Sequence, residues 1–272
     1  MNYYSIEQIK SINSQTFAFI EIKEEDKVLT ITLDRANKKN ALHPQMVNEI
    51  AYAIHYAHFE KNIWVVVLQA KGNIFCAGAD LKAMAGFVEE NNSTIPPPNG
   101  DVLIGELFNK IYKPTIAKVT GDVYAGGFFF LAGSNIVIAQ DNVKFGLPEV
   151  KRGLFPFQVM AALLKIMPAR KVVDWCIRGY NLQVTDAERY GLVTEVVSAE
   201  NINARVDSII NELKENSPSA IRFGLEAFDQ IRPTEDEHKY LYDMLMKTIS
   251  TKDGQEGLQA FREKRKPNWI GE

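Results

Sequence analysis

The sequence has few of the residues that build disulfide networks or metal sites. Its 272 residues include two cysteines, Cys76 and Cys176, and neither has a partner at a metal-binding or redox spacing. His55 and His58 stand three positions apart on a predicted helix, but no third ligand accompanies them, so we interpret both as helix-surface residues. Isolated cysteines are typical of a reducing compartment. We therefore predict a cytoplasmic protein that needs no metal and no cofactor.

Long apolar runs and an excess of basic charge are also absent. No apolar stretch approaches the ~20 residues that cross a bilayer, and residues 1–14 lack the apolar core of a secretory signal. The formal net charge of −3 provides no basic surface for nucleic acid. The sequence has neither a G-x-G-x-x-G turn after a strand nor a Walker loop, which argues against nucleotide cofactors. We expect neither nucleic acid nor a membrane as a partner.

The patterns of apolar residues predict an α/β fold. Alternating polar and apolar residues indicate a hairpin of two half-buried strands over residues 19–23 and 28–33. Helical spacing predicts a helix over residues 44–61, with Pro44 in its first turn. Further strands are expected, with helical stretches between them, over residues 65–69, 116–119, 136–139 and 192–197. Strands that alternate with helices favour a parallel sheet.

The last quarter of the chain is predicted to be helical. Helices are expected over residues 204–216, 219–231 and 236–249. We therefore divide the chain into a core over residues 1–200 and a C-terminal helical region over residues 201–272. Within the core, the segment 86–101 differs from its surroundings because it is polar and rich in proline. We interpret it as a flap over the substrate, with a solvated surface loop as the alternative.

Two turns of small residues are the most informative feature of the sequence. Phe75–Leu81 and Tyr124–Gly127 each follow an apolar run and contain glycine and alanine. Without bulky side chains, the backbone N–H groups of such turns can approach a ligand closely. A helix predicted over residues 128–133 would add its positive end. Two turns facing each other would form an oxyanion hole, which is worth roughly 3–4 kcal/mol per donor in catalysis.

These turns resemble the two oxyanion segments of the crotonase (enoyl-CoA hydratase/isomerase) superfamily. Further segments resemble that superfamily in the same order along the chain: Asn40–Leu42, Lys113–Ala117, Phe145–Val150 with Gly153 and Pro156, and Glu263–Pro267. The resemblance extends over roughly residues 17–270. It implies a spiral of ββα units, an acyl-coenzyme A substrate (or an acyl-carrier-protein thioester), and assembly into homotrimers or hexamers. Coenzyme A would enter only as part of the substrate.

The resemblance also implies which residues act on the thioester. The N–H groups of Ala79 and Gly126 correspond to the oxyanion donors. Asp80 is in addition expected to cap a helix that begins near Leu81. The residues expected around the substrate are Ala41, Ala77, Gly78, Asp80, Leu81, Gly127, Phe129 and Leu154.

One of the two glutamates of the family's hydratases is missing. Phe129 occupies its position, whereas Glu149 matches the second glutamate. A carboxyl that faces an apolar pocket has a raised pKa, which suits proton transfer near neutral pH. The alternative for Glu149 is a surface or ion-paired glutamate beside Lys151 and Arg152. An aromatic acyl pocket is suggested by residues 128–130 together with Leu154, Phe155, Phe157 and Met160, although most of these could be buried core.

A single carboxyl can move one proton between two carbons. The sequence therefore favours double-bond isomerisation of enoyl-CoA. Hydration of enoyl-CoA is the first alternative, and decarboxylation of a glutaconyl-type thioester, which needs fewer acid–base groups, is the second. A non-catalytic acyl-CoA-binding subunit is the third. Lys264, Arg265 and Lys266 form a basic run that is either a solvated face or a contact for the phosphates of coenzyme A.

Overall fold

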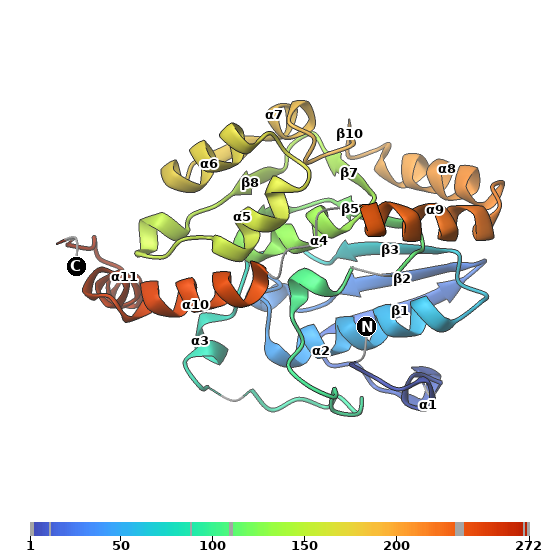
Figure 1. Cartoon of the computed structure of the whole chain (residues 1–272), viewed down its shortest axis with the longest axis horizontal. Coiled ribbons are helices and arrows are strands. Elements are labelled where there is room, and N and C mark those ends of the chain that lie inside the picture. Colours follow the sequence, from blue (N-terminus) through green and yellow to red (C-terminus); the bar gives the residue numbers. More distant parts are fainter. Residues whose placement is uncertain are drawn as a thin grey trace.

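The chain builds two β-sheets surrounded by helices (Figure 1). The computed structural model describes residues 3–10, 12–87, 89–108, 111–231, 237–268 and 270. The first sheet has the strand order β1-β2-β3-β5-β7-β10. Its strands are β1 (Ile20–Glu25), β2 (Val28–Leu33), β3 (Val65–Ala70), β5 (Thr115–Val119), β7 (Ile136–Gln140) and β10 (Glu195–Val197). All neighbouring pairs except β1 and β2 are parallel, so the predicted α/β class with parallel strands is confirmed.

The predicted hairpin is confirmed and closes in a two-residue turn. Asp26 and Lys27 both have positive φ, at 45° and 70°. This conformation of both central residues matches the right-handed twist of the two flanking strands. Glu25 consequently pairs with Val28, and Ile20 pairs with Leu33.

A second sheet of very short strands was not predicted. It has the order β4-β6-β8-β9, with β4 (Ile74–Cys76), β6 (Asp122–Tyr124), β8 (Lys144–Gly146) and β9 (Asn181–Gln183). Three residues are too few to show an alternating pattern in the sequence. From β3 to β8 the chain visits the two sheets alternately, and helices or turns follow each pair.

Helices cover both faces of the first sheet. On one side α2 (Pro44–Phe59) packs over β1 and β2, and on the other side α8 (Ile202–Lys214) packs over β5 and β7. In β3, Val66 and Leu68 belong to the main core, while Val65 and Val67 join a second cluster with Val206 of α8. An apolar strand buried on both faces explains why β3 reads as a continuous apolar run.

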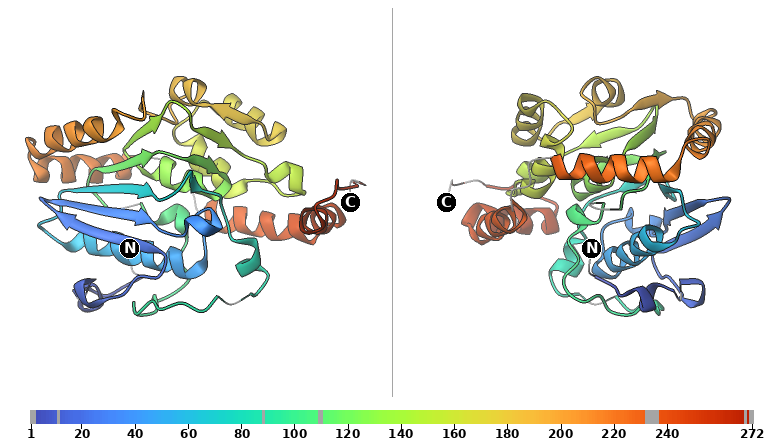
Figure 2. Two further views of the ribbon diagram at one scale, coloured as in Figure 1. Left: turned by 180° about the vertical axis from the view of Figure 1, so that it is seen from behind. Right: turned by 45° about the vertical axis from the view of Figure 1, so that its right-hand side comes forward.

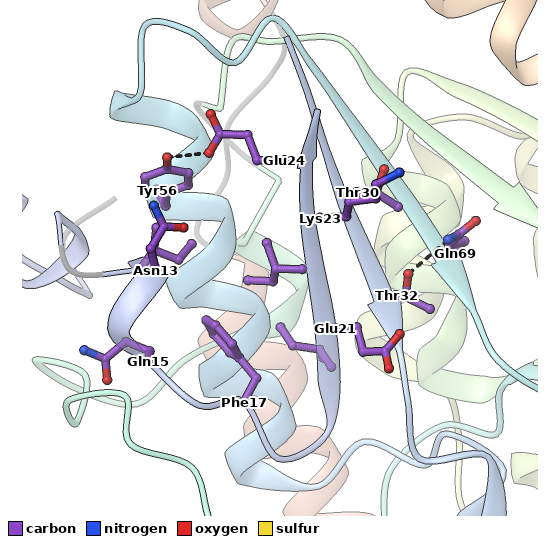
Figure 3. Close-up of a pocket in the computed structure, with 13 residues that line it drawn as sticks. Asn13, Gln15, Phe17, Glu21, Lys23, Glu24, Thr30, Thr32, Tyr56 and Gln69 are labelled. Atoms are coloured by element: carbon purple, nitrogen blue, oxygen red, sulfur yellow. Dashed lines mark hydrogen bonds between the residues drawn. The ribbon is translucent and has the colours of Figure 1, made fainter. Parts of the chain in front are cut away.

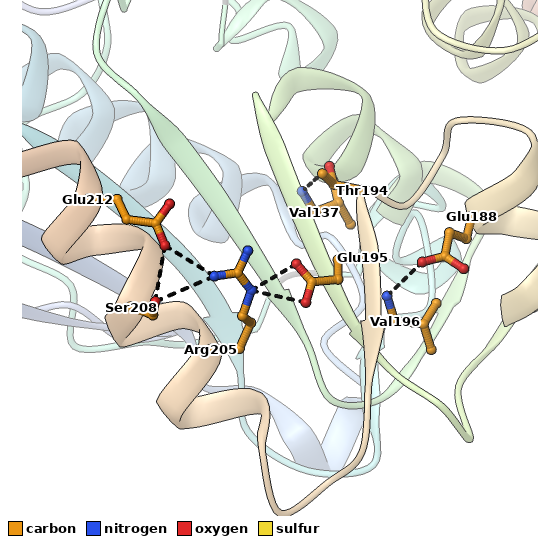
Figure 4. Close-up of polar contacts among 8 residues, drawn as sticks. All are labelled: Val137, Glu188, Thr194, Glu195, Val196, Arg205, Ser208 and Glu212. Atoms are coloured by element: carbon orange, nitrogen blue, oxygen red, sulfur yellow. Dashed lines mark hydrogen bonds and ion pairs between the residues drawn. The ribbon is translucent and has the colours of Figure 1, made fainter. Parts of the chain in front are cut away.

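Polar contacts attach α8 to the edge strand β10 (Figure 4). The Arg205 Nε donates to both carboxylate oxygens of Glu195, at 2.8 and 3.0 Å, and its Nη1 donates to Glu212 at 3.2 Å. The strand predicted from residue 192 begins only at Glu195. The reason is that the N–H groups of Leu192 and Val193 donate to the carbonyl of Ala187, within α7 (Val184–Arg189).

The C-terminal helices follow the predicted positions with one addition. Besides α8, they are α9 (Pro218–Ile231) and α10 (Glu237–Ser250), whose predicted start at Asp236 lies outside the described residues. A further helix, α11 (Lys252–Glu263), was missed because it contains Gly254 and Gly257. Figure 2 shows α10 and α11 projecting from the body of the molecule at the C-terminal end.

The remaining helices are short connections. They are α1 (Ile6–Ile9), α3 (Leu81–Met84), α4 (Phe128–Gly133), α5 (Phe157–Leu164) and α6 (Ala169–Arg178). The described residues also form the 3₁₀ turns η1 (Ile12–Ser14), η2 (Ala36–Lys38), η3 (Ile104–Glu106), η4 (Ala125–Gly127) and η5 (Glu149–Arg152). None of the helices among the described residues is long and apolar enough to cross a membrane.

A hollow of about 570 Å³ lies around the edge strand β1. Figure 3 shows Phe17 and Tyr56 on one side of the strand and Thr30, Thr32 and Gln69 on the other. Two pairs of its polar groups bond to each other: Tyr56 donates to Glu24, and Gln69 donates to Thr32. None of its lining residues comes from the two turns of small residues.

A buried asparagine fixes the loop that follows β2. Asn40 has φ of 48°, a left-handed conformation that asparagine tolerates better than most residues. Its side chain accepts from the Arg35 N–H at 2.9 Å and donates to the carbonyls of Lys71 at 2.9 Å and Ile74 at 2.8 Å. The loop is thereby attached to both ends of the connection between β3 and β4.

Asn40→Ala should destabilise the fold by about 3 kcal/mol, because three buried hydrogen bonds are lost at about 1 kcal/mol each. Urea unfolding followed by circular dichroism measures this. Lys39→Ala is the matched control: Lys39 has φ of 56° but is exposed, so its unfolding free energy should change by less than about 0.5 kcal/mol. Equal losses in the two variants would contradict the role given to the Asn40 side chain.

Candidate active site

Three turns meet at one edge of the second sheet. β4, β6 and β8 are parallel neighbours, with Cys76 paired to Val123 and Tyr124 paired to Gly146. Their carboxyl ends therefore lie side by side, which is where ligands bind in open α/β sheets. The turn after β4 carries Ala79, the turn after β6 carries Gly126, and the turn after β8 carries Glu149. Segments that are far apart in the sequence are thus brought to one place.

The first two turns are in direct contact. Gly78 has φ of 85°, and a Cβ there would lie 2.6 Å from the Ala125 Cβ and 3.1 Å from the Gly126 nitrogen. A Cβ on Gly126 would lie 3.7 Å from the Ala79 nitrogen. Only glycine fits at position 78, on both backbone and steric grounds. The small residues seen in the sequence therefore serve the close approach of two backbones.

The loop after β2 runs alongside the first turn. The Leu42 N–H donates to the Gly78 carbonyl at 2.8 Å, and the Asp80 N–H donates to the Leu42 carbonyl at 3.1 Å. Ala77 donates to Lys39 at 3.1 Å. In this pairing the N–H of Ala79 points away from Leu42. Outside the helices and strands of the described residues, no hydrogen bond uses the N–H groups of Ala79 or Gly126.

A buried arginine joins the segments around Ala79. Arg35, whose side chain is 4% exposed, forms an ion pair with Asp80 at 2.8 Å and donates to the Ala41 carbonyl at 3.1 Å. It also pairs with Glu89, in the loop predicted as a flap. Sequence reasoning missed this residue. Its one signal was a basic residue two positions after the end of the apolar strand β2.

Asp80 has the structural role that was predicted for it. Its side chain accepts from the N–H groups of Lys82 at 3.0 Å and Ala83 at 3.2 Å, so it caps α3. Burial raises the pKa of Asp80, but the hydrogen bonds from Arg35 and from these two N–H groups outweigh it, and the pKa is lowered. Leu81, half-buried, is the first residue of the capped helix.

Glu149 opens the 3₁₀ turn η5 with a carboxyl that lacks a hydrogen-bond partner on one oxygen. The Oε2 atom is buried and unbonded. Burial raises the pKa of Glu149 to about 7, against the opposing effects of its own N–H and of the charge on Arg152. The alternative of an ion pair is wrong, because within the described residues no ion pair joins Glu149 to Lys151 or Arg152. Leu154 supports this turn by donating from its N–H to the Glu149 carbonyl at 3.1 Å.

The three phenylalanines of α4 have different environments. Phe128 packs against Trp175, with ring centres 5.0 Å apart, and Phe130 packs against Phe75. Both are fully buried in the core, so their suggested place in an acyl pocket is wrong. Phe129 is half-buried and lines a cavity of about 90 Å³. Other residues around this cavity are Phe108, Tyr112, Lys165, Leu225, Phe228 and Asp229.

The predicted flap is a loop held at several points. Residues 89–100 contain neither helix nor strand. Thr94 exchanges hydrogen bonds with Thr16, and the Asn99 N–H donates to the Tyr3 carbonyl at 2.8 Å. Together with the ion pair of Glu89, these contacts attach the loop to the N-terminal segment and to Arg35. Its role over a substrate stays a prediction.

The other candidates serve packing or local structure. Burial raises the pKa of Cys76 to about 12, so its thiol stays protonated. The interpretation of His55 as a surface residue is wrong, because it is fully buried beside Tyr4. Arg265 of the basic run pairs with Glu256 at 2.6 and 2.9 Å. Among the described residues no three acidic, cysteine or histidine side chains gather as metal ligands.

Comparisons with known proteins identify the scaffold. The family model described as enoyl-CoA hydratase/isomerase matches residues 23–272. A probable enoyl-CoA hydratase of Mycobacterium bovis is 30% identical over 258 residues, covering 94% of this chain and 99% of the relative. A mevalonyl-coenzyme A hydratase of Aspergillus fumigatus is 30% identical over 250 residues, covering 89% of this chain and 91% of the relative.

A solved structure agrees with this assignment. The crystal structure of a carnitinyl-CoA hydratase from Mycobacterium avium superposes with a TM-score of 0.82 at 28% identity, covering 94% of this chain and all of the other. The fold of this chain therefore has a known counterpart. The chain belongs to the enoyl-CoA hydratase/isomerase (crotonase) family of acyl-CoA enzymes.

Proposed function

We propose that this enzyme moves a double bond between the 3-enoyl and 2-enoyl positions of an acyl-CoA, with Glu149 as its single acid–base group. The observation that carries the proposal is the buried, unpaired Glu149 carboxyl at the end of β8. Glu149 follows β8, and Gly126 follows the neighbouring strand β6. A base with a pKa of about 7 is half ionised at neutral pH, so it can both accept and return a proton.

The N–H groups of Ala79 and Gly126 are proposed as the oxyanion donors. Two observations support this: the turns that carry them are in contact, and the pairing of Leu42 with Gly78 and Asp80 leaves the Ala79 N–H pointing away from Leu42. Held by two such donors, a thioester oxygen takes up the negative charge of an enolate. Fixed backbone donors need no rearrangement as that charge develops.

The reaction then needs one proton to leave and return. Glu149 as carboxylate takes a proton from the α-carbon of the 3-enoyl thioester, which gives a dienolate stabilised at the oxyanion site. The same carboxyl, now protonated, delivers the proton to the γ-carbon, and the double bond ends conjugated with the thioester. No atom is gained or lost. Ala41, Ala77, Gly78, Asp80, Leu81, Gly127, Phe129 and Leu154 are proposed to surround the substrate.

Hydration of a 2-enoyl-CoA is the second candidate. It is favoured by the names of two relatives, a probable enoyl-CoA hydratase and a mevalonyl-coenzyme A hydratase. Against it stands Phe129, an apolar side chain in the position where the resemblance predicts a second carboxyl. A homotrimer or hexamer and a cytoplasmic location stay predictions from the sequence.

Glu149→Gln should lower kcat on a 3-enoyl-CoA by about 10²–10⁴-fold, because the amide cannot take up the α-proton. Product is followed by the absorbance of the conjugated thioester and by mass, which stays constant in isomerisation and increases by one water in hydration. Glu200→Gln, an exposed glutamate, is the matched control and should keep full activity. Full turnover of Glu149→Gln would refute the proposal.

The pH dependence of kcat/KM should reflect the ionisation of Glu149. Burial raises its pKa to about 7, so the protonated form predominates below that pH and cannot act as the base. The isomerase kcat/KM should therefore increase with pH, reach half its maximum near pH 7 and then level off. A profile that is flat from pH 5 to 9 would show that another group carries the proton.

Phe129→Glu should raise hydration of a 2-enoyl-CoA by at least about tenfold, because a second carboxyl can orient the attacking water. Hydration is measured by the loss of conjugated-thioester absorbance. Phe129→Gln, which adds a polar group without a carboxylate, is the control and should show a smaller gain. An unchanged rate in a folded Phe129→Glu protein would mean that this position does not limit hydration.

A further inference from the structure

The helix α11 lies directly on the backbone of the Glu149 turn. A Cβ on Gly257 would come within 2.2 Å of the Arg152 carbonyl oxygen and 2.9 Å of the Gly153 nitrogen. Arg152 and Gly153 end the 3₁₀ turn that Glu149 begins. Glycine inside a helix costs about 1 kcal/mol relative to alanine. The close contact between α11 and the backbone of η5 is the structural reason for glycine at position 257.

One helical turn after Gly257, the same helix contacts the side chain of Arg152. The guanidinium lies 4.5 Å from the centre of the Phe261 ring. A cation over an aromatic face is stabilised by the electron density of the ring. Within the described residues no ion pair joins Arg152 to a carboxylate. The Phe261 ring is therefore the contact recorded for this charge.

The position of this charge matters for Glu149. Arg152 is half-buried on the same turn, and its attraction already lowers the pKa of the carboxyl against the larger effect of burial. The other titratable groups near Glu149 are Cys176, on α6, and the exposed Lys151. From α11 the side chain that contacts the Arg152 guanidinium is Phe261, which is uncharged. An arginine that came within about 4–6 Å of the carboxyl would stabilise its ionised form strongly.

We propose that α11 is a positioning element for Glu149, in which Phe261 holds the Arg152 guanidinium away from the carboxyl and Gly257 seats the helix on the turn. The Glu149 carboxyl thereby stays unpaired and able to exchange a proton. The catalytic part of this inference rests on the proposed function, while the electrostatic part does not. Phe261 and Gly257 act through Arg152 and η5, and neither needs to touch the substrate.

The test is a titration of Glu149 that does not depend on activity. The infrared band of the protonated carboxyl is assigned by its absence in Glu149→Gln and followed against pH. Phe261→Ala should lower the midpoint by about one pH unit or more, because the released Arg152 can pair with the carboxylate. Phe261→Leu keeps the apolar volume without an aromatic face and should shift the Glu149 midpoint in the same direction. This variant replaces Phe261→Ala in the test if the alanine variant does not fold.

A double variant identifies Arg152 as the cause. Arg152→Gln should raise the midpoint, and Arg152→Gln with Phe261→Ala should have the midpoint of Arg152→Gln alone, because no charge is left to release. An unchanged midpoint in both Phe261 variants would overturn the inference. The inference would also be overturned if the midpoint of the double variant fell below that of Arg152→Gln by as much as Phe261→Ala lowers it in the unaltered protein.

Kinetics separate this inference from the proposed function. Gly257→Ala should lower kcat at least tenfold in a folded protein, whereas Gly224→Ala should leave it unchanged, because a Cβ on Gly224 of α9 would meet open space. Unchanged kcat in Gly257→Ala would contradict the seating role. If Glu149→Gln kept full turnover while the midpoint still shifted in Phe261→Ala, the proposed function would fail and the electrostatic role of α11 would stand.

Discussion

The parallel pairing of three three-residue strands is the constraint on which the candidate site depends. β4, β6 and β8 contribute few hydrogen bonds, yet their register fixes which residues follow each strand at one edge of the sheet. The turns after β4 and β6 then have to touch, and this is feasible only because Gly78, at a positive φ, has no side chain. The requirement for small residues is therefore a consequence of strand register. A larger residue at position 78 would separate the backbones that carry Ala79 and Gly126.

Buried charges around this edge are treated in two different ways. Arg35 is buried and ion-paired: it pairs with Asp80 and Glu89 and donates to the Ala41 carbonyl, while its Nε has no hydrogen-bond partner in the described part of the chain. Glu149 is buried and left without a partner on one oxygen, which keeps its pKa near neutral. A paired carboxyl would gain stability but lose its capacity to exchange a proton at neutral pH. Arg152 is intermediate: its guanidinium contacts the aromatic ring of Phe261 from α11, but no ion pair is found for it among the described residues.

Membership of the family defines the scaffold and the thioester class, while the reaction depends on a few side chains placed on that scaffold. Phe129 shows the difference. It lies on α4, between two phenylalanines that are fully buried in the core, yet it alone is half-buried and faces a cavity. Three identical residues in a row thus have separate roles because a helix turns each one to a different side.

The sequence by itself determined the α/β class, the hairpin, the main helices, the two glycine turns and Glu149, because these features are local patterns of apolar spacing or short motifs. Tertiary structure alone decided what lies beside them. The second sheet was missed because strands of three residues have no visible period, and α11 was missed because its glycines read as helix breakers. Arg35, Asn40 and the contact of Phe261 with Arg152 join residues that are distant in the chain. No local pattern encodes such contacts, since they depend on how separate elements pack against one another.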